Sequence, residues 1–279
     1  MKLNNLKINQ LLRPANDLEL TEISTAITSV DISWNEYTRF VNFNILRHNY
    51  SRLSYAHSKP LEYLTTIKLL GLKNGDCILD AAGGGEAEYI RALMEFTKLE
   101  LTIYCEDSLL DGQNADGITY IGGSIEAIPL PDESLDGIAC HHSFEHFRDD
   151  LDVKFVQEAV RLLKVGGKLA ITPLFLTNEY AEIWNKMNVE IYKPEKANTI
   201  IDRTGSFAGW GAYEGFARTY SPSAFKERIL ENLPSNCTAE VCKVLLDGKP
   251  VPDIEKNYHQ PFLNAQMKVL LITKIKTYR

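Results

Sequence analysis

Hydrophobic residues between positions 60 and 173 follow two alternating patterns of spacing. Apolar residues three or four positions apart predict helices over 60–71, 86–97 and 151–164. Short apolar runs predict strands at 77–81, near 101, 118 and 136, and after Gly166-Gly167 through Thr172. Strands and helices that alternate at this length indicate an α/β domain with a mostly parallel sheet and helices on both faces.

The segments on either side of this pattern have a different character. Residues 1–58 carry aromatic side chains at helix-compatible spacing and predict an N-terminal helical lid. Residues 174–220 are rich in aromatic residues and glycine and predict an inserted substrate cap, because they follow a strand whose end faces the ligand crevice. The alternative is that both segments only pack against the domain. A helix over 222–232 and strands at 241–246 and 267–273 complete the sheet.

These patterns divide the chain into four parts. We predict a lid over 1–58, an α/β core over 59–173, a cap over 174–220 and the remainder of the core sheet over 221–279. Tyr55 and His57 in the lid, and Trp210 and Tyr213 in the cap, are the candidate substrate-binding residues. With 279 residues and 44% hydrophobic content, one elaborated domain can bury a sizeable core.

A run of small residues follows the strand at 77–81. Asp80 ends a buried apolar stretch, and Ala82 through Gly85 let a ligand approach the backbone closely before the next helix begins. The dinucleotide fingerprint G-x-G-x-x-G does not fit, because Glu88 stands at the third glycine position. A phosphate-binding P-loop does not fit either, because no Gly-Lys-Ser or Gly-Lys-Thr follows this turn.

The turn, Asp80-x-Ala82-x-Gly84-x-Glu86, resembles the first motif of the class I S-adenosylmethionine-dependent methyltransferases. Three further segments are similar to the family in the same order. They are the strand that ends in Glu106-Asp107-Ser108, the segment 123–136, and the helix, glycine turn and strand over 158–171. The resemblance covers residues 58 to 173 and implies a Rossmann-like, mostly parallel seven-stranded sheet with an antiparallel final strand.

The resemblance also implies the cofactor, S-adenosylmethionine, and the residues that hold it. Ala82, Gly83 and Gly84 would line its methionine and ribose part, with Asp80 supporting this loop. An acid about twenty residues beyond the glycine turn suits the ribose hydroxyls, and Glu106 stands there with Asp107 as the second choice. By the same resemblance, Ser124 and Ile125 would border the adenine, and His141 would lie beside the reactive end.

Three histidines and a glutamate cluster in residues 140–146, just beyond the strand near 136. Methyl transfer to a hydroxyl needs a base, and a histidine suits neutral pH. His142 is the first candidate, followed by Glu145 and His146; each of the three has a structural role as its alternative. A metal site is the less favoured interpretation, because no H-E-x-x-H is present, and we predict none.

Charge and composition exclude some function classes. The 30 basic and 37 acidic residues give a net charge of −7 without a dense Lys/Arg run, so a nucleic-acid partner is not expected. The first residues lack the apolar core of a signal peptide, and no stretch approaches a membrane span of about 20 residues. We therefore expect a cytoplasmic protein without membrane contact, with reduced cysteines, and compatible with a homo-oligomer.

Together these features predict an enzyme that transfers a methyl group from S-adenosylmethionine to a small-molecule or sugar-containing acceptor, with O-methylation favoured. Two alternatives stay open. One is an oxidoreductase on the same scaffold, which the missing third glycine disfavours. The other is a non-catalytic partner subunit, suggested by the departures from the common motif at Ala82, Glu86 and Ser124.

Overall fold

The computed structural model describes residues 12–23, 25–43, 46, 58–110, 112, 114–185, 199–202, 215–251 and 267–276. The four candidate substrate-binding residues lie outside these ranges, so their roles stay predictions: Tyr55, His57, Trp210 and Tyr213.

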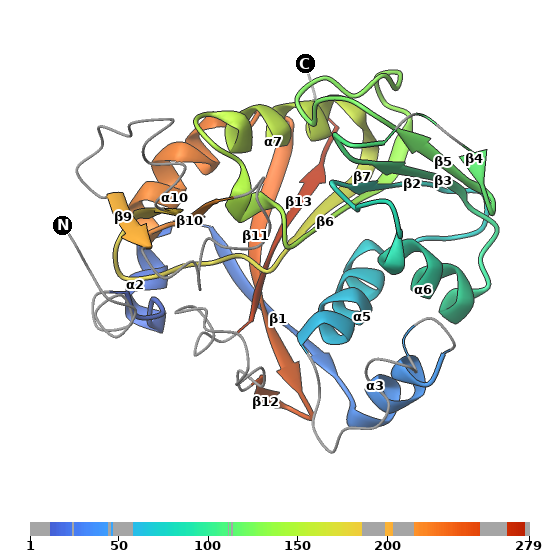
Figure 1. Ribbon diagram of the computed structural model, residues 1–279. Helices are drawn as coiled ribbons and strands as arrows, with labels where there is room; N and C mark the ends of the chain where they lie inside the picture. Colours follow the sequence, from blue (N-terminus) through green and yellow to red (C-terminus); the bar gives the residue numbers. More distant parts are fainter. Residues whose placement is uncertain are drawn as a thin grey trace.

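A single large sheet runs through the described part of the molecule (Figure 1). Its strands, in chain order, are β1 (Ala26–Ile32), β2 (Cys77–Ala81), β3 (Thr102–Glu106), β4 (Asn114–Ala115), β5 (Ile118–Ile121), β6 (Leu135–His141), β7 (Leu163–Thr172), β11 (Cys237–Leu246), β12 (Lys249–Pro250) and β13 (Lys268–Lys274). They follow the order β1-β11-β13-β7-β6-β2-β3-β5-β4, and β12 pairs with β11.

The predicted seven-stranded sheet forms the centre of this arrangement. Strands β5, β3, β2, β6 and β7 are parallel neighbours, and β13 runs antiparallel to both β7 and β11. The Rossmann-like fold with an antiparallel final strand is thereby confirmed. The chain crosses from one side of β2 to the other between β5 and β6, which creates a topological switch point beside β2, where α/β proteins bind ligands.

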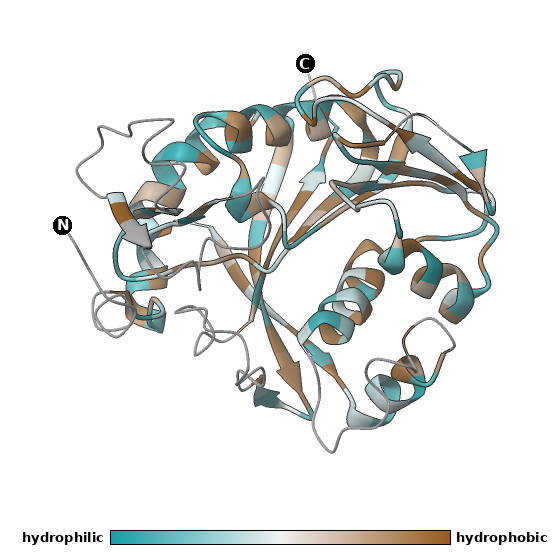
Figure 2. Cartoon of the chain, in the orientation of Figure 1, coloured by the Kyte–Doolittle hydropathy of each residue, from teal (hydrophilic) through white to brown (hydrophobic). Residues whose placement is uncertain are grey.

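Helices cover both faces of the sheet, as the alternating pattern predicts. On one face lie α3 (Trp34–Val41), α5 (Ser58–Leu70) and α6 (Glu88–Thr97), and on the other lie α7 (Leu151–Leu162) and α10 (Pro222–Arg228). Each face has its own buried apolar cluster. Figure 2 shows hydrophobic residues concentrated along the central strands, with hydrophilic stretches on the outer helices. The two clusters hold the sheet rigid and fix the ends of its strands.

The N-terminal segment contains a strand where the sequence predicts a helical lid. Residues 26–32 form β1, which pairs in parallel with β11 from Ala26 opposite Glu240 to Ile32 opposite Leu246. The prediction of a helical segment is therefore wrong for this stretch. Its β-branched residues suit a strand. The capping box between Ser33 and Glu36 begins helix α3 only at Trp34, while α2 (Asp17–Leu20) and η1 (Thr21–Ile23) precede β1.

Within the predicted cap, the described residues form a second, three-stranded sheet. Its strands are β8 (Ala181–Asn185), β9 (Thr199–Asp202) and β10 (Phe216–Thr219), in the order β10-β8-β9. Arg218 on β10 is fully buried and forms an ion pair with Asp152 on α7, with 2.7 Å between Nη1 and Oδ2. Its guanidinium also donates to the Phe147 carbonyl. This buried pair fixes β10 beside the one-turn helix η2 (Phe144–His146).

Two chemical features complete the fold. All five cysteines are free thiols, and burial raises the pKa of Cys105 and Cys140. Among the helices of the described residues, none combines the length and apolar character needed to cross a membrane.

Candidate active site

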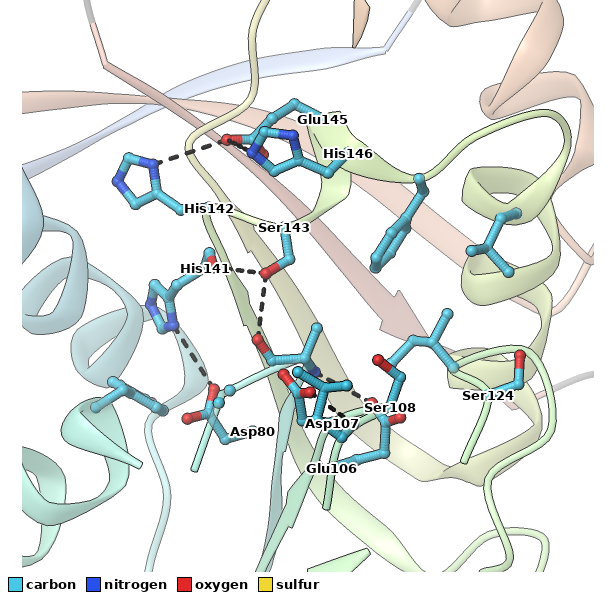
Figure 3. Close-up of a pocket in the computed structure, with 18 of the residues that line it drawn as sticks. Asp80, Glu106, Asp107, Ser108, Ser124, His141, His142, Ser143, Glu145 and His146 are labelled. Carbon is cyan, nitrogen blue, oxygen red and sulfur yellow. Dashed lines mark hydrogen bonds and ion pairs between the residues drawn. The ribbon is translucent and has the colours of Figure 1, made fainter. Parts of the chain in front are cut away.

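A cleft of about 600 Å³ opens at the carboxyl ends of β2, β3 and β6. It lies at the switch point of the sheet, as expected for a ligand site in an α/β protein. Every described candidate site residue lines it: Asp80, Ala82, Gly83, Gly84, Glu106, Asp107, Ser124, Ile125, His141, His142, Glu145 and His146. In Figure 3, His142, Glu145 and His146 gather on one side of the cleft, which we call the histidine side. Asp80, Glu106 and Asp107 lie on the other, the cofactor side.

The glycine turn on the cofactor side is shaped by its contact with Asp80. A Cβ atom on Gly83 would lie 2.5 Å from the Asp80 Cγ atom, so only glycine fits there without displacement. The Gly83 amide donates to the Glu106 carbonyl at 3.0 Å, which joins the turn to the end of β3. Gly84 adopts a φ of 70°, a conformation that favours glycine. The backbone of the turn therefore faces the cleft directly.

The two buried acids of the cofactor side have raised pKa values. Burial raises the pKa of Glu106 to about 7, and the Ala82 amide, which donates to its Oε2 at 3.2 Å, offsets this only in part. Burial likewise raises the pKa of Asp80, although His141 opposes the rise. Their acceptor oxygens, placed at two strand ends, suit a ligand that brings hydroxyl groups or positive charge.

His141 lies between Asp80 and helix α5. Its Nδ1 is 3.9 Å from Asp80 Oδ1, which is too long for a hydrogen bond, while Nε2 contacts the Thr66 hydroxyl at 3.0 Å. The rings of Tyr63 and Tyr89 pack against the imidazole, with centroids 4.9 and 4.5 Å away. Among the described residues, three buried polar atoms here have no hydrogen-bond partner: Asp80 Oδ1, His141 Nδ1 and the Tyr89 hydroxyl. Such atoms together mark a place for a polar ligand.

His142 on the histidine side is held between two buried acids. Its Nε2 lies 2.7 Å from Glu62 Oε2 on α5, and its Nδ1 lies 3.7 Å from Glu145 Oε1. Burial opposes the charge of the ring most strongly, but the two carboxylates outweigh it and raise the pKa of His142 to about 10. The Glu145 pKa is lowered in turn, because the histidines beside it overcome its burial.

This environment argues against His142 as the general base, the role that the sequence suggests first. A ring with a pKa of about 10 already carries both protons at neutral pH, so it can donate a hydrogen bond but cannot accept a proton. His146 makes a different contact. Its Nδ1 lies 2.6 Å from the Phe216 carbonyl, which only accepts, so Nδ1 is the donor of that hydrogen bond.

Several residues that line or support the cleft were not predicted from the sequence. They are Lys59, Tyr63, Tyr89, Ser108, Gly123 and Ser143, which line it, and Glu62 and Thr66, which stand behind the histidines. Glu62 and Thr66 are four residues apart and buried on one face of α5. Residues four positions apart lie on one helix face, and buried polar groups there need partners inside the protein.

The described residues contain no group of three or more His, Cys, Asp and Glu side chains arranged to hold a metal ion. The carboxylates beside His142 and His146 instead form ion pairs with the imidazoles.

Comparison with known proteins agrees with this geometry. Residues 81–171, which run from the end of β2 to the end of β7, match the family described as the methyltransferase domain. This segment is a class I S-adenosylmethionine-dependent methyltransferase domain. The match includes the glycine turn, the acids at the end of β3 and the three histidines at the end of β6 and just beyond it, so both sides of the cleft belong largely to the methyltransferase domain.

The curated relatives share this domain over part of their length. The chain is 32% identical over 105 residues to phthiotriol/phenolphthiotriol dimycocerosates methyltransferase 1 of Mycobacterium ulcerans. The aligned segment covers 36% of this chain and 37% of that relative. It is 29% identical over 116 residues to the ubiquinone/menaquinone biosynthesis C-methyltransferase UbiE of Escherichia coli. This alignment covers 38% of the chain and 45% of that relative. The match thus spans less than half the length of these relatives.

Among the solved structures to which the chain is similar is one that aligns along nearly all of it. It is the 1,6-didemethyltoxoflavin-N1-methyltransferase of Burkholderia thailandensis with bound 1,6-didemethyltoxoflavin and S-adenosylhomocysteine. It is 11% identical, covers 95% of both chains, and has a TM-score of 0.48.

The residues of the cleft fit S-adenosylmethionine, the cofactor of the methyltransferase domain. Gly83 has no side chain beside Asp80, so a ligand can reach the backbone of the turn. Glu106 is buried and offers acceptor oxygens at the end of β3. Among the described residues, Asp80 Oδ1 and the Tyr89 hydroxyl have no hydrogen-bond partner, so a ligand could supply one. The cofactor carries hydroxyl, amino and sulfonium groups that suit this acidic lining.

Proposed function

We propose that this protein is an S-adenosylmethionine-dependent methyltransferase that acts on a small-molecule or sugar-containing acceptor, with a hydroxyl oxygen as the favoured target. The observation that carries the proposal is one cleft at the switch point with two chemically different sides. The acidic cofactor side suits a positively charged methyl donor. The histidine side offers groups that hold and move protons, which donor binding alone does not require.

The bound cofactor supplies an electrophilic methyl group on a sulfonium, and the protein must align the acceptor with it and exclude water. Glu106 would accept hydrogen bonds from the ribose hydroxyls, and the turn from Ala82 to Gly84 would hold the methionine part. Ser124 and Ile125 would border the adenine. His141, packed between two tyrosine rings, would lie beside the reacting centre.

The names of the relatives agree with a small organic acceptor and leave its reacting atom open. One relative is named as a C-methyltransferase of quinone biosynthesis, and another as a methyltransferase of phthiotriol and phenolphthiotriol dimycocerosates. A hydroxyl acceptor is favoured for this chain because imidazole side chains, which can exchange protons with a hydroxyl group, line the cleft. The predicted cap, anchored through Arg218, is well placed to contact the acceptor.

Calorimetric titration of the full chain with S-adenosylmethionine and S-adenosylhomocysteine tests the proposal. We expect saturable binding of both compounds, and we expect Glu106→Gln to weaken it about tenfold, because two charge-assisted hydrogen bonds to hydroxyls are replaced by weaker ones. Glu100→Gln is the matched control, since Glu100 is an exposed acid just before β3. Its affinity should equal that of the unaltered chain.

The same titration separates the alternatives. Binding of a nicotinamide dinucleotide in place of both sulfur compounds would favour the oxidoreductase. A folded chain that binds none of them would favour the non-catalytic partner subunit. If the cofactor binds, mass spectrometry of pooled small-molecule fractions incubated with the protein and methyl-labelled cofactor would identify the acceptor by its labelled methyl group.

A further inference from the structure

One face of helix α5 runs along the cleft. Thr66 contacts His141 Nε2 at 3.0 Å, and the Tyr63 ring packs against the same imidazole with 4.9 Å between the centroids. Lys59 stands four residues before Tyr63, so its side chain continues this face toward the start of the helix, and it lines the cleft. Helix α5 precedes the matched segment 81–171, so Lys59 lies outside the methyltransferase domain match.

The charge of Lys59 differs from that of most of the lining. Among the described residues that line the cleft, it is the one lysine or arginine beside four acids, which are Asp80, Glu106, Asp107 and Glu145. In the part of the chain that the structure describes, its ammonium has no hydrogen-bond or ion-pair partner. Burial raises the pKa of Asp80, and the positive charge of Lys59 is among the groups that oppose this rise. A cation in this setting suits a ligand that brings a carboxylate.

Two buried acceptor atoms lie in the same corner of the cleft. Asp80 Oδ1 and the Tyr89 hydroxyl have no hydrogen-bond partner among the described residues, and both side chains are at least nine-tenths buried. The Tyr89 ring packs on His141 with 4.5 Å between the centroids, and Figure 3 shows Asp80 facing that imidazole. Carboxylate and hydroxyl oxygens both accept hydrogen bonds, so this pair suits an ammonium group, which only donates.

Together these groups complement the two charges of an α-amino acid. Such a group carries an ammonium and a carboxylate on one carbon atom, and neither charge alone would use both Lys59 and Asp80. A carboxylate that entered the cleft without reaching Lys59 would meet the repulsion of the acids that line it. The first turn of α5 adds a weak attraction for negative charge, because the positive end of the helix dipole lies there.

We propose that Lys59 binds the carboxylate at the α-amino-acid end of the cofactor, while Asp80 and Tyr89 hold the ammonium of the same group. Lys59 thereby makes the cleft selective for a cofactor that keeps its carboxylate over the decarboxylated form. This inference rests on the proposed function, and it gives a binding role to a residue outside the matched domain.

The first test compares three ligands by calorimetry on the full chain. S-adenosylhomocysteine carries both charges, its decarboxylated analogue S-adenosyl-3-thiopropylamine keeps only the ammonium, and 5′-methylthioadenosine carries neither. We expect S-adenosylhomocysteine to bind at least about tenfold more tightly than the decarboxylated analogue, because the analogue lacks the charge-assisted hydrogen bond from Lys59. General attraction by the acids of the cleft would favour the more positive analogue, so the opposite preference requires a specific partner for the carboxylate.

Substitutions of Lys59 identify that partner. Lys59→Met removes the charge and keeps a side chain of similar length, so it should weaken S-adenosylhomocysteine about tenfold and leave the two ligands without a carboxylate within about twofold. Lys59→Arg keeps the charge and should stay within about threefold of the unaltered chain for all three ligands. Lys73→Met is the matched control and should change none of the affinities, since Lys73 is exposed and does not line the cleft.

Tyr89→Phe examines the ammonium end with the same ligands. It should weaken S-adenosylhomocysteine and the decarboxylated analogue several-fold and by the same factor, because both carry the ammonium that the hydroxyl accepts from. The affinity for 5′-methylthioadenosine should stay within about twofold, since this ligand has no ammonium. An equal loss for all three ligands would mean that the hydroxyl contacts another part of the cofactor, and the assignment of the ammonium would be overturned.

Two results would overturn the role of Lys59. One is equal affinity of the unaltered chain for S-adenosylhomocysteine and its decarboxylated analogue, which is expected if the carboxylate that Lys59 binds belongs to the acceptor instead. The other is an equal loss of all three ligands in Lys59→Met. The ligand comparison needs no variant, so it decides the inference even if Lys59→Met does not fold. A folded chain that binds none of the three ligands would contradict the proposed function itself, whereas binding without discrimination contradicts this inference alone.

Discussion

The two sides of the cleft are both built around buried acids, and they treat negative charge in opposite ways. On the cofactor side, burial raises the pKa of Asp80 and Glu106. On the histidine side, the Glu145 pKa is lowered because charged imidazole lies beside it. Imidazole on the histidine side therefore balances part of the charge of the carboxylates beside it. The cofactor side leaves acceptor oxygens for a ligand to satisfy, which is the preorganisation that a donor of hydroxyl groups and positive charge requires.

The largest effect is expected where the cofactor side depends on the absence of a side chain. In Gly83→Ala, the new methyl group would lie 2.5 Å from the Asp80 Cγ atom and displace either the turn or the acid. We expect the affinity for S-adenosylmethionine to fall about 100-fold, as overpacking costs about 3 kcal/mol at such a contact. Calorimetry measures the loss directly.

Gly85→Ala is the matched control for that variant. Among the residues that the structure describes, a Cβ atom on Gly85 would meet Leu110 alone, at the ordinary contact distance of 3.7 Å. The variant should bind the cofactor within about threefold of the unaltered chain, a change of less than 1 kcal/mol. Equal losses in the two variants would mean that the whole turn tolerates no side chain, and the special role of the Asp80 contact would be refuted.

The second prediction compares stability across pH for one acid from each side. Glu106 has a pKa of about 7 in the folded protein, above its usual value of 4.5. The protonated side chain therefore contributes fully to the stability of the fold below pH 4.5, and this contribution is lost as the pH rises through 7. At pH 8, Glu106→Gln should therefore raise the free energy of unfolding by about 2 kcal/mol. The increase should vanish below pH 4.5.

Glu145→Gln should change stability in the opposite direction. Its lowered pKa means that the ionised side chain stabilises the fold above its usual pKa and that this contribution is lost as pH falls through the folded value. Removing the charge leaves His142 with one carboxylate, so the free energy of unfolding at pH 8 should fall by about 2 kcal/mol. Chemical denaturation at several pH values checks both variants. Changes of the same sign would show that the two sides do not differ.

The sequence predicted the cofactor side better than the histidine side. Asp80, the glycine turn and Glu106 follow one another at the ends of strands whose apolar runs are unambiguous, so their meeting at one sheet edge follows from parallel pairing. The location of His142 was predicted in the same way. Its proton affinity was not, because the carboxylate of Glu62 approaches from α5, eighty residues earlier in the chain.

The flanking segments show a second reason for failure. Strand β1 has few buried positions because it is the outermost of the described strands of the sheet, where it pairs with β11. Its aromatic-rich surroundings suggested helices, and tertiary pairing with β11 decided the outcome. In the same way, Phe216 contributes through its backbone carbonyl, which accepts a hydrogen bond from His146 Nδ1. Any residue type at this position could provide the same backbone carbonyl, so the sequence does not indicate such a contact.

The smallest effect is expected from a single hydroxyl on the cofactor side. The Tyr89 hydroxyl is buried near Asp80 and, among the described residues, has no hydrogen-bond partner. Tyr89→Phe should therefore raise the free energy of unfolding of the free protein by about 1 kcal/mol, since an unsatisfied polar group is removed. If the cofactor satisfies that hydroxyl, the same variant should bind S-adenosylmethionine about fivefold more weakly.

Tyr120→Phe separates these two effects from a general response to losing a hydroxyl. The Tyr120 hydroxyl accepts from Arg91 at 3.4 Å and does not line the cleft, so its removal should leave cofactor affinity unchanged and give no gain in stability. Thermal or chemical denaturation with and without cofactor measures the stability and the cofactor affinity of both variants. A Tyr89→Phe protein that is less stable when free would show that its hydroxyl is already satisfied. The description of the cofactor side as a place with polar groups left for a ligand would then fail at this residue.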